Sequence, residues 1–99
     1  MGIDYELINN EEDSQYEFHI DGLVPRLEYI KVKDKIFLTH TDIPKGLEGK
    51  NIAKTLVQKV LEDVERKKLS VIPQCPFVTM YIKRHPEWNK LVYEGNKKG

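Results

Sequence analysis

The stretch from Ile36 to Gln74 constrains the fold more than any other, because its hydrophobic period changes twice along it. Ile36 to Asp42 predicts a strand that is apolar at its start and polar at its end. From Asn51 to Lys68 apolar side chains recur at helical spacing, whereas Leu69 to Gln74 is short, β-branched and uncharged, as a strand buried on both faces would be. A strand, a helix and a strand in this order predict a β-α-β crossover whose two strands are parallel neighbours.

The rest of the chain predicts three more strands and a second helix. A first strand is expected over Tyr5 to Ile8, and alternating apolar and polar residues predict a second over Tyr16 to Ile20. Asp21-Gly22 marks a two-residue hairpin turn because both positions tolerate positive φ, and a third strand follows over Arg26 to Val32. A helix from Cys75 to about His85 completes the pattern. We expect an α+β protein with an α/β-like core: a mixed, mostly antiparallel sheet, one parallel crossover and two main helices.

Length and composition favour one soluble domain. The chain has 99 residues, and we expect a single domain at 1–94 followed by a disordered tail at 95–99. Its one cysteine, Cys75, excludes an internal disulfide and suits a reducing compartment. The longest uncharged run, Leu69 to Ile82, contains two prolines and is too short to span a bilayer, and the first residues lack a signal region. A cytoplasmic protein with no membrane partner is expected.

Charge is balanced overall but not along the chain. The 16 basic and 16 acidic residues cancel, so nothing in the total suggests nucleic acid as a partner. Residues 1–30 carry eight acidic side chains and one basic, a net of −7, which leaves +7 for residues 31–99. Two interpretations stay open: solvated faces of opposite sign with no specific target, or a second half that favours a polyanionic ligand.

A loop with two glycines joins the predicted strand to the predicted helix. The stretch from Asp42 to Val57 contains Gly46 and Gly49 just before the helix starts. Backbone N–H groups at a helix N-terminus have no intrahelical partner and carry partial positive charge, so such a loop can cradle a phosphate. The alternative is plain turn chemistry.

The second turn of interest places a thiol at a strand end. Pro76 suits the first position of a helix, so Cys75 lies near the N-cap, where the helix dipole favours the thiolate. His40, two residues before the end of its strand, was a candidate to face Cys75 as a base. The alternatives are a small buried hydrophobe at Cys75 and a structural hydrogen-bonding role for His40. Both turns follow the carboxyl ends of the parallel strands, where open α/β sheets place ligands.

Three residues of the second helix complete the set of candidates. Tyr81 either points into the cleft or fills the core, while Arg84 and His85 either meet an anion or interact with the helix's own carbonyls. A zinc site built from Cys75, His40 and His85 lacks the usual ligand spacing, so no metal is expected.

Four motifs follow one another in the second part of the chain. They are His40-Thr41-Asp42-Ile43-Pro44, Leu47-Glu48-Gly49-Lys50-Asn51-Ile52-Ala53-Lys54, Ile72-Pro73-Gln74-Cys75-Pro76-Phe77-Val78 and Tyr81-Ile82-Lys83-Arg84-His85-Pro86-Glu87. In this order they resemble the GNAT superfamily of acyl-CoA-dependent N-acetyltransferases, and in particular a small single-domain subfamily with a Cys-Pro-Phe motif. The similarity runs from about Leu27 to Val92.

The resemblance implies that acetyl-CoA lies between the fourth and fifth strands. Its pyrophosphate would bind backbone N–H groups of the loop, and its pantetheine would pair with the edge of the fourth strand. The residues implied for the cofactor are Thr41, Asp42, Ile43, Glu48, Gly49, Lys50, Asn51, Ile52, Ala53, Lys54 and Arg84. The implied catalytic residues are Cys75, His40 and Tyr81, with Tyr81 protonating the departing CoA thiolate.

The sequence departs from the superfamily at two points. Glu48 stands where the loop pattern has Arg or Gln, and Asn51 replaces the central Gly. Residues 9–15 are too few for the two helices that shape the acceptor site in larger members, so an open site for a protein or peptide amine or a small polyamine is implied. The leading hypothesis is acetyl transfer to an unidentified amine, by direct attack or through acetyl-Cys75. The alternatives are a non-catalytic acyl-CoA-binding module and a CoA-independent interaction domain that uses the acidic first half.

Overall fold

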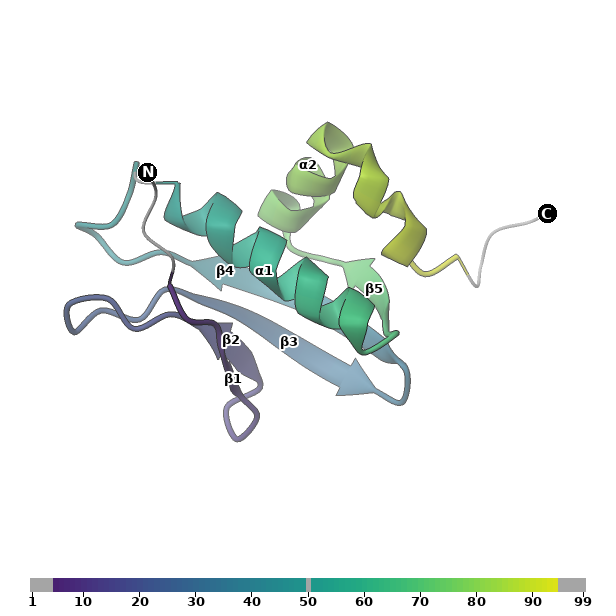
Figure 1. Ribbon diagram of the computed structural model, residues 1–99, viewed down its shortest axis with the longest axis horizontal. Coiled ribbons are helices and arrows are strands. Elements are labelled where there is room, and N and C mark those ends of the chain that lie inside the picture. Colours follow the sequence, from purple (N-terminus) through teal and green to yellow (C-terminus); the bar gives the residue numbers. More distant parts are fainter. Residues whose placement is uncertain (1–4, 50, 95–99) are drawn as a thin grey trace.

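The computed structural model describes residues 5–49 and 51–94, which form one five-stranded sheet with helices packed against it (Figure 1). The expected tail at 95–99 lies outside the described residues. In chain order the elements are β1 (Ile8–Asn10), β2 (Gln15–Glu17), β3 (Arg26–Val32), β4 (Lys35–Asp42), α1 (Ile52–Arg66), β5 (Ser70–Pro73), α2 (Pro76–Arg84) and the 3-10 helix η1 (Pro86–Leu91).

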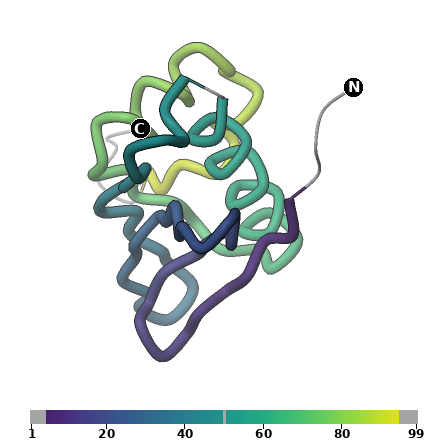
Figure 2. The backbone as a smooth tube through the Cα atoms, turned by 90° about the vertical axis from the view of Figure 1, so that its left-hand side faces the viewer, coloured from purple at the N-terminus to yellow at the C-terminus, as the bar shows by residue number. Residues whose placement is uncertain are grey.

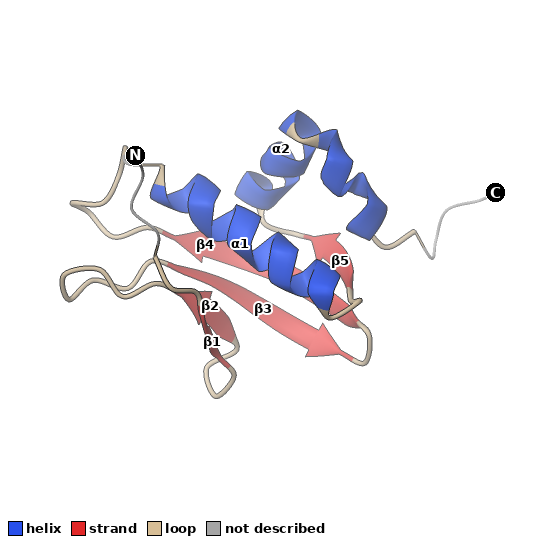
Figure 3. Ribbon diagram, viewed as in Figure 1, coloured by secondary structure: helices blue, strands red, loops and turns tan. Residues whose placement is uncertain are grey.

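The sheet follows chain order, β1-β2-β3-β4-β5 (Figure 3). Its first four strands are antiparallel, and β5 pairs in parallel with β4 after the chain has crossed over through α1. This confirms the predicted crossover and the α+β class. Antiparallel neighbours are joined by short turns, whereas the parallel pair needs the helix as its connection.

Two of the predicted strands are shifted in the structure. The first lies at Ile8–Asn10 instead of Tyr5 to Ile8, because its register is set by pairing with β2, in which Asn10 faces Gln15. The second is shorter than predicted, although an isolated bridge between Ile20 and Leu23 keeps that segment extended. The turn between them has positive φ at Asp21 (51°) and at Gly22 (80°), as expected.

The core lies between one face of the sheet and α1, which stand side by side in Figure 2. The helix buries one stripe, because its apolar residues recur every three or four positions. Leu56, Val60 and Leu61 are fully buried there, as are Leu27 of β3 and Leu38 of β4. Helix α2 adds Val78, Tyr81 and Ile82 to the same cluster. In the part of the chain that the structure describes, no helix is long and apolar enough to cross a membrane.

The prediction that the last strand is buried on both faces was wrong. In β5 only Val71 is fully buried, while Ile72 is half-buried. On the same side of the sheet Ile30 and Val32 are 56% and 49% exposed. The physical reason is that α1 covers only one face, so the other face, called the outer face below, stays open.

A bulge changes which way the end of β4 faces. The ladder between β3 and β4 passes from the pair Tyr29–Leu38 to the pair Glu28–His40, so it skips Thr39. The Thr39 hydroxyl donates to the Glu28 carbonyl at 3.2 Å. One extra residue shifts the alternation of side chains by one position. Beyond the bulge Thr41 therefore turns toward the core side, and His40 turns toward the outer face.

Candidate functional site

Strands β4 and β5 separate before β4 ends, and this opens a gap in the sheet. In the described ladder their pairing ends at Leu38 and Pro73. The Leu38 carbonyl then accepts the backbone N–H of both Gln74 (3.0 Å) and Cys75 (2.9 Å), which turns the chain into α2. A gap at the carboxyl end of a parallel pair is where α/β sheets place ligands. The predicted turn at Cys75 begins there.

Cys75 lies at this gap, against Thr41. Its Sγ is 3.2 Å from Thr41 Oγ1, and the residue is only 4% exposed. Cys75 is the N-cap residue of α2, and Pro76 occupies the first turn, as predicted. A hydroxyl at this distance can donate to a thiolate or accept from a thiol. A donor molecule reaches the sulfur only if Thr41 or the surrounding side chains shift.

His40 does not occupy the place expected for it. The bulge at Thr39 turns its side chain to the outer face, where it is exposed and lies opposite Glu28 in the ladder. Thr41, which the sequence assigned to cofactor binding, contacts Cys75 in its stead. A role for His40 as base stays a prediction.

Three of the described residues in the loop from β4 to α1 have a left-handed backbone conformation. Gly46 (φ 97°), Gly49 (φ 79°) and Asn51 (φ 60°) all have positive φ, which Gly adopts freely and Asn tolerates. No described side chain caps α1, and no acidic residue lies in its first turn. The N–H groups of Ile52 and its neighbours thus lack intrahelical partners, which favours an anion at this end. The predicted contact at Lys50 lies outside the described residues.

These unpartnered N–H groups adjoin a cleft of about 370 Å³. The cleft contains seven of the eleven predicted cofactor-binding residues and two that the prediction missed, Leu47 and Phe77. Its lining residues are Ile43, Leu47, Glu48, Gly49, Asn51, Ile52, Ala53, Lys54 and Phe77.

A smaller cleft of about 70 Å³ continues along α2 and shares Lys54 and Phe77 with the first. It adds Tyr81 and Arg84, both predicted, together with His85 and Met80. Met80 was missed, although it follows Phe77 by three positions and so shares a helix face with it. The structure brings Tyr81 and Arg84 into one groove with the loop residues.

The Tyr81 hydroxyl is held in its neutral form. Burial raises the pKa of Tyr81, and the carboxylates of Glu87 and Glu62 raise it further. The ring lies against the imidazole of His85, with 4.3 Å between the ring centroids. At neutral pH the phenol therefore keeps its proton and can donate it.

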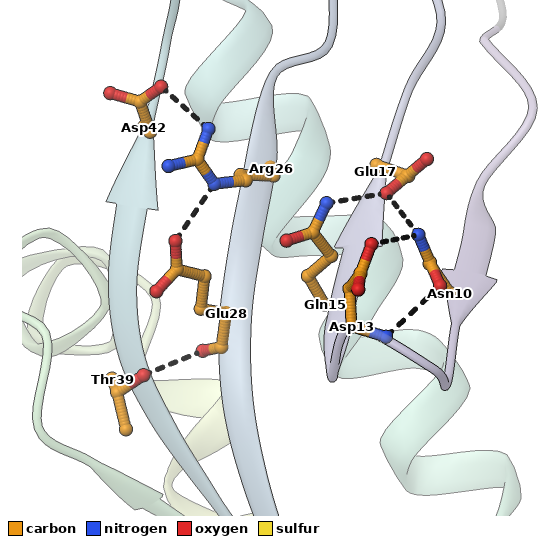
Figure 4. A network of polar contacts seen from close by, with 8 residues as sticks. All are labelled: Asn10, Asp13, Gln15, Glu17, Arg26, Glu28, Thr39 and Asp42. Carbon is orange, nitrogen blue, oxygen red and sulfur yellow. Dashed lines mark hydrogen bonds and ion pairs between the residues drawn. The ribbon is translucent and has the colours of Figure 1, made fainter.

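The carboxylate of Asp42 takes part in a polar network with Arg26. On the outer face its side chain accepts from Arg26 at 3.1 Å, and Arg26 also donates to Glu28 at 2.8 Å (Figure 4). Binding of pantetheine at the strand edge from Thr41 to Ile43 stays a prediction. Among the described residues no cluster of His, Cys, Asp and Glu could hold a metal ion.

Two kinds of comparison with known proteins give matches. The sequence profile of a family described as GCN5-related N-acetyl-transferase matches residues 15–91. The solution NMR structure of a GCN5-like protein from Staphylococcus aureus superposes with a TM-score of 0.69 at 18% identity, covering 90% of this chain and 88% of that chain. At this identity the likeness shows a shared fold. Curated protein sequences give no match.

Proposed function

Because the chain belongs to the GCN5-related N-acetyltransferase family, we propose that it transfers an acetyl group from acetyl-CoA to an amine at the gap between β4 and β5. The observation that supports this most is the joining of the uncapped α1 N-terminus and the side of α2 in one groove, with Lys54 and Phe77 in both clefts. Backbone N–H groups there suit the pyrophosphate, and the apolar lining suits the pantetheine arm.

In the direct route, the amine nitrogen attacks the thioester carbonyl carbon and the C–S bond breaks. The departing CoA thiolate takes the phenolic proton of Tyr81, whose raised pKa keeps that proton available. Water accepts the proton that the amine loses, because His40 faces the outer side of the sheet, and solvent returns a proton to the tyrosinate. Tyr81 acts as the acid.

In the covalent route, Cys75 Sγ attacks the same carbon and the C–S bond to CoA breaks. The amine nitrogen then attacks the carbonyl carbon of acetyl-Cys75, the new C–S bond breaks, and the Cys75 sulfur leaves with the proton that the amine loses. The position at the N-terminus of α2 and the contact with Thr41 place the thiol at the gap, whereas the burial of Cys75 opposes attack. Mass spectrometry after incubation with acetyl-CoA separates the routes. The covalent route is supported if Cys75 carries an acetyl adduct and if Cys75→Ser loses both the adduct and turnover. Direct attack is supported if Cys75→Ala forms no adduct and keeps full activity.

The acceptor is a protein or peptide amine or a small polyamine. A tight turn of described residues joins β1 to β2, so no helix walls off an acceptor at that point. This fits an open acceptor site, and an amine panel tests it.

Binding is tested first, by thermal shift with acetyl-CoA. A ligand at a hundred times its Kd stabilises the folded state by about 2.7 kcal/mol, which is a readily measured shift. Lys54→Ala should reduce the shift, because Lys54 lines both clefts. Lys83→Ala is the matched control, since Lys83 is an exposed cation of α2 that lines neither cleft. Equal loss in both variants, or no shift in the wild type, would contradict the proposed site.

Turnover then separates the proposal from its alternative, a non-catalytic acyl-CoA-binding module. Glu48 lines the cleft at the expected pyrophosphate position, which is the observation that favours the alternative. Calorimetric binding of acetyl-CoA without turnover on any amine of the panel would support the module.

A further inference from the structure

The outer face of the sheet carries a row of apolar side chains that crosses three strands. Ile30 of β3 pairs with Phe37 of β4, and Phe37 pairs with Ile72 of β5. Val32, two residues beyond Ile30, faces the same way. Ile30 and Val32 are exposed, whereas Phe37 and Ile72 are half-buried. We call Ile30, Phe37 and Ile72 the outer apolar row.

Single exposed apolar side chains are ordinary, but a contiguous row on an open sheet face is characteristic of an interaction surface. The described helices lie elsewhere: α1 covers the opposite face, and α2 contacts α1, β5 and η1. The apolar row thus lacks the covering layer that sheets of this composition normally have.

Charges flank the row in a self-complementary way. On one side of the row is Glu28, which lies two residues before Ile30 on β3. On the other side is Lys35 of β4, which pairs with Val32, two residues after Ile30. The side chains of Glu28 and Lys35 are 35% and 32% exposed. Both stand about 7 Å along the strand from the row, one on each side of it.

A twofold axis that runs parallel to the row, midway between two stacked sheets, exchanges these two flanks. It lays Glu28 of one copy over the Val32–Lys35 pair of the other, and it stacks one apolar row on its own image. A closed dimer requires such a surface, which complements itself under rotation. Two sheets stack about 10 Å apart, which side chains of this size can fill.

We propose that a second copy of this chain packs on the outer apolar row and forms an isologous dimer. The proposal does not depend on the proposed function. Within a copy, Glu28 is bonded to Arg26, and Lys35 lies 3.5 Å from Asp34 and over the ring of Tyr93. In the dimer Lys35 would add a second cation to Glu28. The two clefts are lined by the β4–α1 loop, α1 and α2, so the dimer leaves them open.

Sedimentation equilibrium over a wide range of concentrations tests the proposal with the full chain. The wild type should reach twice the mass of one chain, and Ile30→Asp should shift dimerisation to at least about a hundredfold higher concentration, because each dimer would bury two charges in its apolar centre. Met80→Asp is the matched control, an exposed apolar residue on α2, and should dimerise as the wild type does. A monomer at every concentration, or dimerisation unchanged in Ile30→Asp, would overturn the proposal.

Charge exchange tests the orientation. Lys35→Glu should weaken dimerisation about tenfold, because two attractive contacts per dimer become repulsive. The double variant Glu28→Lys with Lys35→Glu restores opposite signs and should return to within about threefold of the wild type. Circular dichroism confirms that each variant folds. Failure of the double variant to recover, with its fold intact, would rule out this twofold arrangement.

Discussion

The two ends of α1 differ in how their polar groups are satisfied. At the C-terminal end, the buried Tyr16 hydroxyl donates to Asp63 at 2.7 Å, and Asp63 also pairs with Lys67 at 2.9 Å and with Arg66. At the N-terminal end, no described side chain caps the helix, and its first N–H groups adjoin a cleft. We call the first the closed end, because its polar side chains are bonded to one another, and the second the open end, because its first backbone N–H groups lack intrahelical partners.

The two ends of α1 therefore serve different properties: the C-terminal end contributes to stability, and the N-terminal end is proposed to bind the ligand. The closed end ties β2 to α1 through side chains that are hydrogen-bonded to one another. The open end keeps backbone groups available at some cost in helix stability, since an uncapped helix forgoes about 1 kcal/mol. Changes at one end should therefore leave the property of the other end almost untouched.

The largest expected effect comes from Tyr81→Phe at the open end. Removal of the acid that protonates the CoA thiolate should lower kcat about a hundredfold, with the Kd for acetyl-CoA and the Tm nearly unchanged. Steady-state kinetics and calorimetry measure the two quantities. A kcat within about threefold of the wild type would remove Tyr81 from the chemistry.

At the closed end, Tyr16→Phe should cost about 1–3 kcal/mol of stability, because buried Asp63 loses its phenol donor. Each 1 kcal/mol lowers the Tm of a domain of this size by about 4–8 °C. Acetyl-CoA affinity should not change. Tyr29→Phe is the matched control: its hydroxyl donates to half-buried Asn9 at 2.7 Å, so the loss should be smaller. Equal losses would contradict the special role of the Tyr16–Asp63 pair.

The same pair should make the protein sensitive to acid. Burial opposes the ionisation of Asp63, but hydrogen bonds from Tyr16 and Lys67 outweigh it and hold the pKa of Asp63 below 3.8. The folded state thus binds fewer protons than the unfolded state, so this stability is present above about pH 4 and is lost as the pH falls further.

Urea midpoints measured from pH 7 to pH 2 check this sensitivity. Asp63→Asn should flatten the acid limb of the curve. Burial opposes the ionisation of Glu17 too, but its hydrogen bonds to His19, Gln15 and Asn10 outweigh burial and lower its pKa. Glu17→Gln should therefore also flatten part of the acid limb of the stability curve. An unchanged acid limb in Asp63→Asn would show that the pair does not act through its charge.

The smallest effect is expected from restoring the superfamily pattern in the loop. Glu48→Arg with Asn51→Gly removes a carboxylate from the cleft and relaxes a left-handed residue, and should tighten acetyl-CoA binding about threefold to tenfold. The free energy of unfolding should hardly change, because the Tyr16–Asp63 hydrogen bond at the other end of α1 is unaffected. Calorimetry with unchanged affinity would mean that the loop does not meet the pyrophosphate as proposed.

Local sequence signals predicted much of this fold. The strand over Arg26 to Val32 and the crossover from β4 through α1 to β5 follow from period and turn residues alone. The loop and α2 placed most of the predicted cofactor residues along one groove, because spacing along the chain decides which residues flank a helix start.

The remainder depends on contacts between distant residues. The bulge at Thr39 is chosen by pairing with Glu28 on another strand, so no local pattern revealed that Thr41 and not His40 would contact Cys75. The bond from Tyr16 to Asp63 joins residues 47 positions apart, and neither residue stands out by itself. The first strand was misplaced because Asn9 and Asn10 resemble turn residues, whereas β2 holds them in a ladder.

The contact between Thr41 and Cys75 gives the molecule a built-in reporter. The chain has one sulfhydryl, and the contact covers it at the point where β4 and β5 part. A thiol-directed reagent can label it only while that seam is open, so the labelling rate counts openings of the seam. The labelling rate of Cys75 can be measured with and without acetyl-CoA, and no engineered probe is needed. A higher rate with acetyl-CoA would show that the donor separates β4 from β5 at this point, and a lower rate would show that it keeps them together.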